Sequence, residues 1–259
     1  MDPVIRKFIF HDLQTVEGYI DPPDALVFLS LLQSQEAKGL SGGIAEIGVF
    51  YGRSYFLVRK IANADEKVLA IDLFEQAAKG NVSQYKRFVE TGRRLNLPVD
   101  EGLIIKGDST RLEPNDITDR IGKVRFFSID GGHMLPDVLA DGSLAMDCLA
   151  EHGVIAFDDT FNPAWPEVTV GLADILRRKS EAFSAFCMTR FRTYVCRREF
   201  HEFYRRTIAN AQDLSAFDHT ETEFLGSSVT RLHDPIRRRV VYELMARLRM
   251  RGLLERVYR

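Results

Sequence analysis

Acidic side chains and one histidine follow two apolar runs of the chain. Residues 130–133 read Asp-Gly-Gly-His, and residues 158–160 read Asp-Asp-Thr. If the two apolar runs are neighbouring strands about 4.8 Å apart, Asp130 and either Asp158 or Asp159 can converge on one hard cation with oxygen ligands. The alternative for each aspartate taken singly is a cap on the helix that follows. Because Asp158 and Asp159 are adjacent, we favour a metal site over a helix cap.

A turn with two glycines follows an earlier apolar run. Residues 46–54 read Glu-Ile-Gly-Val-Phe-Tyr-Gly-Arg-Ser, and glycine lets the backbone approach a ligand closely. Asp72, twenty residues after Gly52, ends the next run, where its carboxylate could accept hydrogen bonds from both hydroxyls of a ribose. The third run ends in Gly107-Asp108-Ser109, which suits an adenine edge. Together these features predict a nucleotide-like cofactor bound by Glu46, Gly48, Tyr51, Gly52, Ser54, Asp72, Asp108, Ser109 and Asp130.

Each part of this cofactor pattern also has a structural explanation. Gly48 and Gly52 would serve equally to form a tight turn and close helix packing, and Asp108 before Ser-Thr is an ordinary helix cap. The pattern is E-x-G-x-x-x-G rather than the G-x-G-x-x-G of dinucleotide-binding folds, so the glycine facing a pyrophosphate is missing. An NAD-dependent oxidoreductase is therefore the weaker interpretation.

The elements that must position these residues alternate along residues 41–198. Short apolar runs alternate with amphipathic stretches, which is typical of βαβ units and a mostly parallel sheet. A helix is predicted from about Pro166 to Arg178, and Phe183–Thr189 and Arg192–Arg197 are spaced as an antiparallel hairpin. Because ligands of such sheets bind beyond the carboxyl ends of the strands, the polar residues fall where a site is expected. The predicted strands are Gly43–Ile47, Val68–Ile71, Leu103–Lys106, Val124–Ile129 and Val154–Phe157.

Two appendages flank this core. Residues 1–40 are predicted to be a helical lid or edge-covering element, and residues 199–259 a mostly helical appendage with one strand-like stretch, Phe224 to Leu232. Nine arginines stand against three acidic residues between Arg231 and Arg259, on a segment with an apolar stripe. Such a helix can pack on the core or on a second subunit, or lie on an anionic membrane or RNA. We favour packing, and with it a homo-oligomer.

Composition limits the classes of function. The 259 residues carry 35 basic and 37 acidic side chains, a formal charge of −2, which argues against a nucleic-acid partner. Three cysteines without metal-site spacing suit a reducing compartment. Neither a signal-peptide pattern nor a run of about 20 apolar residues is present, so stable membrane insertion is not expected and a cytoplasmic location is.

The acid and glycine spacing at 46–52 resembles the first motif of class I S-adenosylmethionine-dependent methyltransferases. The run from Asp130 to Thr160, with Asp141 and Gly153 between, is similar to the group of macrocin-type sugar O-methyltransferases and cephalosporin hydroxylase-like proteins, and the resemblance spans roughly residues 20–197. It implies an α/β fold: a doubly wound, mostly parallel, seven-stranded Rossmann-like sheet with an antiparallel last strand. It also implies S-adenosylmethionine as cofactor and a small-molecule acceptor, a sugar or another hydroxylated metabolite.

The same resemblance implies roles at the second cluster. Mg²⁺ would be held by Asp130, Asp158 and Asp159, and His133 with Asp130 would be catalytic, His133 as the proton acceptor. A bound dication stabilises a developing alkoxide, and a neutral imidazole is available near pH 7 to take the proton. The expected function is metal-assisted O-methylation. Two alternatives stay open: a non-catalytic scaffold that uses the arginine-rich helix, and a His133 that only orients substrate.

Trp165 and Asn162 lie on the loop after Asp159, above the same edge of the predicted sheet. With Tyr51, these side chains could hold an adenine or pack on a sugar through an aromatic face. Trp165 also precedes Pro166, so it could serve only to anchor the start of the next helix.

Overall fold

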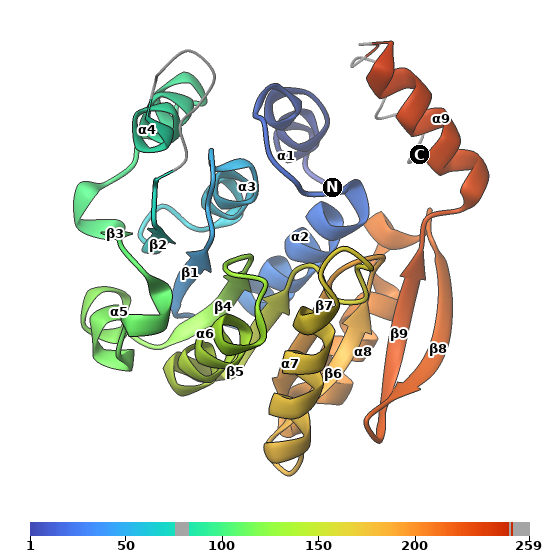
Figure 1. The fold of residues 1–259 in the computed structure, drawn as a ribbon. Helices are drawn as coiled ribbons and strands as arrows, with labels where there is room; N and C mark the ends of the chain where they lie inside the picture. Colours follow the sequence, from blue (N-terminus) through green and yellow to red (C-terminus); the bar gives the residue numbers. More distant parts are fainter. Residues whose placement is uncertain (76–82, 249, 251–259) are drawn as a thin grey trace.

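A mixed β-sheet with helices on both faces forms the core (Figure 1). The computed structural model describes residues 1–75, 83–248 and 250. Within them the sheet has nine strands in the order β3-β2-β1-β4-β5-β7-β6-β9-β8. The strands are β1 Gly43–Ile47, β2 Val68–Asp72, β3 Ile104–Lys106, β4 Val124–Ile129, β5 Leu149–Phe157, β6 Phe183–Met188, β7 Thr193–Arg197, β8 Asp218–Phe224 and β9 Ser227–His233.

The first five strands are parallel, and β7 runs antiparallel between β5 and β6. The predicted hairpin of β6 and β7 is thereby confirmed. From β1 the chain moves outward to β2 and β3, then returns to place β4 on the other side of β1. The reversal of strand order between β1 and β4 is the place where open α/β sheets bind their ligands.

The predicted number of seven strands was wrong, because a hairpin of β8 and β9 extends the sheet beyond β6. β9 pairs parallel with β6 through Cys187 and Met188, and β8 pairs antiparallel with β9. The outer strand β8 has the sequence Asp-His-Thr-Glu-Thr-Glu-Phe and is exposed along nearly its whole length. An edge strand that buries neither face has no apolar alternation, so its sequence carries little β signal.

The two sheet faces bury separate apolar layers. Helices α2, α3 and α8 pack on one face around Phe126, and helices α5, α6 and α7 pack on the other face around Phe127. Because successive strand residues point to opposite faces, one apolar run supplies both layers. The helices are α1 Pro3–Lys7, α2 Pro22–Ala37, α3 Arg53–Ile61, α4 Gln84–Arg94, α5 Pro114–Ile121, α6 Leu135–Cys148, α7 Pro166–Arg178, α8 His201–Asn210 and α9 Ile236–Arg247.

Helix α2 belongs to the core although it lies in the segment predicted to be a lid. Phe28 packs edge-on against Phe126 and Tyr194, with ring centroids 4.7 and 6.1 Å apart. Gln35, fully buried, donates to the carbonyl of Arg125 at 2.9 Å. Within residues 1–40, the loop before α2 and the first turn of α2 border a cavity.

Helix α9 projects beyond the β8–β9 hairpin (Figure 1). Its apolar side chains Ile236, Val240, Leu244 and Leu248 are 55–75% exposed, so this stripe does not pack on the core of the described chain. Residue 249 and residues 251–259, with four of the nine arginines of the predicted basic segment, lie outside the described residues.

Candidate active site

The backbone places the ends of β1, β4 and β5 in register. Ile47 is aligned with Ile129, and Ile129 with Phe157. The next residues continue the ladder: Asp130 N–H donates to the Ile47 carbonyl and Asp158 N–H to the Ile129 carbonyl, each at 2.9 Å. The two aspartate segments therefore leave the sheet side by side, next to the glycine turn after β1.

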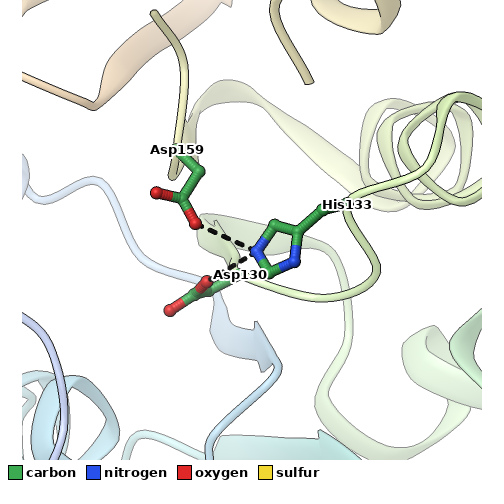
Figure 2. Close-up of side chains that lie close together, drawn as sticks. All are labelled: Asp130, His133 and Asp159. Carbon is green, nitrogen blue, oxygen red and sulfur yellow. Dashed lines mark ion pairs between the residues drawn. The ribbon is translucent and has the colours of Figure 1, made fainter. Parts of the chain in front are cut away.

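Asp130, His133 and Asp159 converge at this edge (Figure 2). His133 Nε2 lies 2.9 Å from Asp159 Oδ2 and 4.0 Å from Asp130 Oδ1. All three side chains are partly buried, with 21–29% of their surface exposed. Asp159 itself has left-handed backbone (φ 56°), and its other carboxylate oxygen accepts a 2.6 Å hydrogen bond from Asn162. The group offers two oxygen donors and one nitrogen within reach of a single ion.

The two carboxylates differ in their electrostatic environment. Burial raises the pKa of Asp130 well above its usual range, and the neighbouring charges of Asp158 and Asp159 raise it further. Burial also acts to raise the pKa of Asp159, but hydrogen bonds from His133 and Asn162 outweigh it, and that pKa is lowered. Asp130 is thus a carboxylate whose charge a nearby cation would stabilise.

Asp158 lines the same cavity but has other hydrogen-bond partners. Its Oδ2 accepts a hydrogen bond from Arg192 Nη2, and its Oδ1 accepts one from the Asp159 N–H at 2.9 Å. Arg192 lies immediately before β7, and 1% of its side chain is exposed. Of the three predicted metal ligands, the structure brings together Asp130 and Asp159, adds His133, and pairs Asp158 with an arginine.

The indole ring of Trp165 packs on one face of the His133 imidazole. The two rings stack with centroids 4.3 Å apart and planes 12° apart. Trp165 also immediately precedes α7, which starts at Pro166. The stacking orients the candidate base, a contact that the sequence did not predict for Trp165.

A cavity of about 500 Å³ opens above these residues. Its floor includes Asp130, His133 and the Asp158–Arg192 pair, and its walls carry aromatic side chains. The aromatic residues are Tyr19, Trp165 and Phe191. A cavity of this volume with an aromatic lining suits a small organic molecule.

Asp24, in the first turn of α2, forms another buried polar group of the cavity wall. Its Oδ1 accepts hydrogen bonds from Thr189 Oγ1 at 2.7 Å and from the Tyr194 hydroxyl at 2.6 Å. Burial raises its pKa to about 6, against the opposing effect of the Arg192 charge. These contacts tie α2 to the β6–β7 hairpin directly beside the site.

The glycine turn after β1 is under tight steric constraint. Gly48 has φ 81°, and a Cβ added there would lie 1.7 Å from the carbonyl oxygen of Asp130. Gly52 has φ 91° at the N-terminus of α3, where a Cβ would lie 2.3 Å from the Phe56 ring. Both glycines are required by the turn and by packing, which is the structural explanation that the sequence left open.

Two predicted cofactor acids make hydrogen bonds inside the protein. Asp72 accepts from the N–H of Phe50 at 2.8 Å with Oδ2 and from the N–H of Phe74 at 2.7 Å with Oδ1. Asp72 thus joins the end of β2 to the glycine turn. Glu46 is fully buried and accepts a 2.5 Å hydrogen bond from Ser54. Burial raises the pKa of Glu46 to about 8.

The remaining predicted cofactor residues differ in exposure. Tyr51 is 4% exposed, packed against the tilted ring of Phe50 and covered by the Arg87 guanidinium. Asp108 is partly exposed and caps the turn that follows it by accepting from Thr110 N–H and Oγ1. Ser109 lies near the buried carboxylate of Asp141, whose pKa burial raises to about 6. The tyrosine ring is thus a packing element, and Asp108 is a cap.

The comparisons with known proteins agree with this architecture. Residues 45–160, which contain the glycine turn, Asp72, Asp108, Asp130, His133 and the Asp158–Asp159 pair, match the model of a methyltransferase domain family. Over these residues the chain is similar to methyltransferase domains. The resemblance inferred from the motifs is thereby confirmed for this part of the chain.

Solved structures similar to the chain show the same fold. The O-methyltransferase NovP has a TM-score of 0.56 at 15% identity, over 66% of this chain and 77% of NovP. The calicheamicin methyltransferase CalS11 gives 0.50 at 16% identity, over 68% of this chain and 78% of that one. A candidate O-methyltransferase from Klebsiella pneumoniae gives 0.50 at 14% identity, over 75% and 89%. A search of curated proteins found no match.

Outside the methyltransferase domain, the cavity has residues that sequence reasoning missed. Arg192 was read only as the start of an apolar strand, although an arginine beside a fully buried run is a signal in itself. Tyr19 lies in the segment before α2, and Asp24 lies in the first turn of α2, so both precede residues 45–160 in the sequence.

No helix of the described chain is long and apolar enough to cross a membrane.

Proposed function

We propose that this chain transfers the methyl group of S-adenosylmethionine to a hydroxyl oxygen of a small acceptor. The observation that carries the proposal is the position of His133 beside Asp130 and Asp159, on the floor of a cavity that adjoins the β1 turn of a methyltransferase domain. A base beside an acceptor-sized cavity is what proton removal from a hydroxyl requires.

The cofactor would lie at the strand-order reversal between β1 and β4. There the backbone of Gly48 packs directly against the Asp130 carbonyl, which brings the turn after β1 and the end of β4 together. Asp72 Oδ1 accepts hydrogen bonds from the Phe74 N–H and from Gln84, whereas Oδ2 accepts one from the Phe50 N–H and retains a further lone pair, which a ribose hydroxyl can use. The methyltransferase match supports S-adenosylmethionine rather than a dinucleotide.

The donor set fits a divalent ion. Asp130 and Asp159 offer oxygen atoms, the ligand type that Mg²⁺ prefers, and the mutual repulsion of the carboxylates is what a cation relieves. Bound there, Mg²⁺ would supply Lewis-acid stabilisation of charge on the acceptor oxygen. Imidazole nitrogen is a poor ligand for Mg²⁺, which leaves His133 free to act as a base.

The protein's own residues then have distinct tasks. His133 accepts the acceptor's proton at an imidazole nitrogen. Trp165 fixes the plane of that ring by stacking, and Asp159, 2.9 Å away, stabilises the imidazolium that forms. The exposed faces of Tyr19 and Phe191 would pack on the acceptor's ring, be it a sugar or another hydroxylated ring.

The first test is calorimetric titration of the protein with S-adenosylhomocysteine, with and without Mg²⁺, alongside the variant Asp72→Ala. Micromolar binding that the variant loses is the expected result. Acceptors are then screened with radiolabelled S-adenosylmethionine against nucleotide sugars, glycosides and catechols. Absence of binding in all conditions would contradict the proposal and favour a non-catalytic scaffold.

A further inference from the structure

The Asp158–Arg192 ion pair stands next to the candidate metal site without joining it. Both oxygens of Asp158 are engaged, one by the Arg192 guanidinium and one by the Asp159 N–H. The three residues whose donor atoms converge are Asp130, His133 and Asp159. The adjacent acids Asp158 and Asp159 therefore point to different partners.

Arg192 has little freedom to release Asp158. Its side chain is 1% exposed, and its guanidinium lies 5.1 Å from the centroid of the Phe28 ring. Within the described chain, Nε and Nη1 have no hydrogen-bond partner. If Asp158 turned toward a metal, a permanently charged guanidinium would stay buried without its hydrogen-bonded carboxylate, an arrangement that proteins strongly disfavour.

We propose that Arg192 acts as an internal counterion that withdraws Asp158 from the metal site, so that Asp130 and Asp159 are the protein's carboxylate ligands for the divalent ion. The inference rests on the proposed function, because it concerns the metal of that same site. Arg192 is a positioning residue: it holds the Asp158 carboxylate, and through the hydrogen bond from the Asp159 N–H to that carboxylate it sets the turn that presents Asp159.

The counterion also sets the charge of the site. When Asp130, Asp158 and Asp159 are ionised, these three carboxylates and Arg192 together carry a formal charge of −2, and Asp21 and Asp24 also line the cavity. Without the guanidinium, Asp158 would be a third free carboxylate beside the ion. Metal affinity would then rise, because attraction between opposite charges strengthens in a partly buried site.

The experiment measures Mn²⁺ binding to the metal-free protein by electron paramagnetic resonance, in the absence of any acceptor. Asp130→Asn and Asp159→Asn should each weaken binding at least tenfold. Arg192→Gln should tighten it about tenfold. The double variant Asp158→Asn/Arg192→Gln removes the ion pair as a unit and should bind within threefold of wild type, as should Arg192→Lys, which keeps a cation for Asp158.

The opposite results overturn the inference. If the double variant loses Mn²⁺ affinity as severely as Asp159→Asn, Asp158 is a metal ligand. If Arg192→Gln binds Mn²⁺ no more tightly than wild type, Arg192 does not act as a counterion that limits metal affinity. Absence of Mn²⁺ binding by the wild-type protein would also refute it. S-adenosylhomocysteine titration of each variant tests the proposed function separately and confirms that the variant is folded.

A second measurement needs no variant. Anomalous diffraction from crystals of the wild-type protein soaked in Mn²⁺ locates the ion and its ligands. We expect Asp130 and Asp159 at the metal and Asp158 still on Arg192. Direct coordination by Asp158 would refute the inference even if the variants proved unstable.

Discussion

His133 is held by two neighbours of different kinds, a carboxylate and an indole. Replacing it with Gln removes the base and leaves the cavity nearly the same size. We expect His133→Gln to lower kcat by ~10²- to 10³-fold, the range typical of a general base, with cofactor affinity unchanged. Radiolabelled methyl transfer and S-adenosylhomocysteine titration measure the two quantities.

Trp165 provides the matched control for that experiment. Trp165→Phe keeps an aromatic face on the imidazole and should retain most of the activity, whereas Trp165→Ala should lower kcat by ~10-fold because the ring plane is no longer fixed. Full activity of His133→Gln would assign proton removal to another residue and leave His133 only a substrate-orienting role.

Glu46 makes folding stability depend on pH. Its pKa is about 8 in the folded protein because of burial, far above the ordinary value for glutamate, so the folded state binds this proton more tightly than the unfolded state. Stability from this group is complete below about pH 4.5 and is lost as the pH rises toward 8. Glu46→Gln cannot ionise and keeps an oxygen for Ser54.

The melting temperature of Glu46→Gln should therefore exceed that of wild type by ~4 °C or more at pH 9 and differ little at pH 4.5. Thermal unfolding followed by circular dichroism across this range checks it. Asp24 and Asp141, whose pKa values burial raises to about 6, remain in both proteins and cancel in the comparison. A constant difference at all pH values would mean that Glu46 does not titrate as inferred.

At the scale of elements, the β1–β4 edge depends on one glycine. In Gly48→Ala the new methyl group would meet the Asp130 carbonyl oxygen, and the residue would need a left-handed backbone. We expect a loss of more than ~3 kcal/mol in the free energy of unfolding, together with loss of S-adenosylhomocysteine binding. Chemical denaturation and calorimetry measure the two effects.

Gly107→Ala is the matched control for this variant. Gly107 also follows a strand of the same sheet, but a Cβ there meets no atom within 4 Å. It should change stability by less than ~1 kcal/mol. Equal effects of the two substitutions would contradict the steric explanation for Gly48.

At the scale of the whole molecule, the β8–β9 hairpin is part of the main sheet, whereas α9 stands apart. Val229 and Leu232 of β9 are buried in the apolar layers on opposite faces of the sheet. A chain ending at Asp234 should keep a melting temperature within ~3 °C of the full chain. A chain ending at Phe217 should lose at least ~10 °C or aggregate, because the edge of β6 becomes exposed. Equal stability of the two truncated chains would place the hairpin outside the cooperative fold.

The exposed apolar stripe of α9 is where the expected homo-oligomer can be tested. Exposed apolar surface of this extent marks contact sites in soluble proteins, and a second copy is the partner favoured from the sequence. Light scattering should give a dimer mass for the full chain and a monomer mass for the chain ending at Asp234. A monomer in both cases would remove the oligomer prediction.

The positions of the parallel strands, and the acids that follow them, could be predicted from the sequence alone. Both faces of β1, β2 and β4 are buried, so these strands appear in the sequence as short, nearly continuous runs of apolar residues. The residue after such a run leaves the core, which is why Asp72 and Asp130 could be placed at one edge of the sheet from spacing alone.

Which side chains meet at that edge could not be predicted without the folded structure. Asp158 and Arg192 are 34 positions apart, and Asp24 and Tyr194 are 170 apart, so no local pattern links either pair. The polar strand β8 likewise became a strand only because β9 offered it hydrogen bonds. Buried strands can be recognised in the sequence because each appears as a run of apolar residues. Pairing between polar groups that are distant in sequence depends on the packed fold that brings them together.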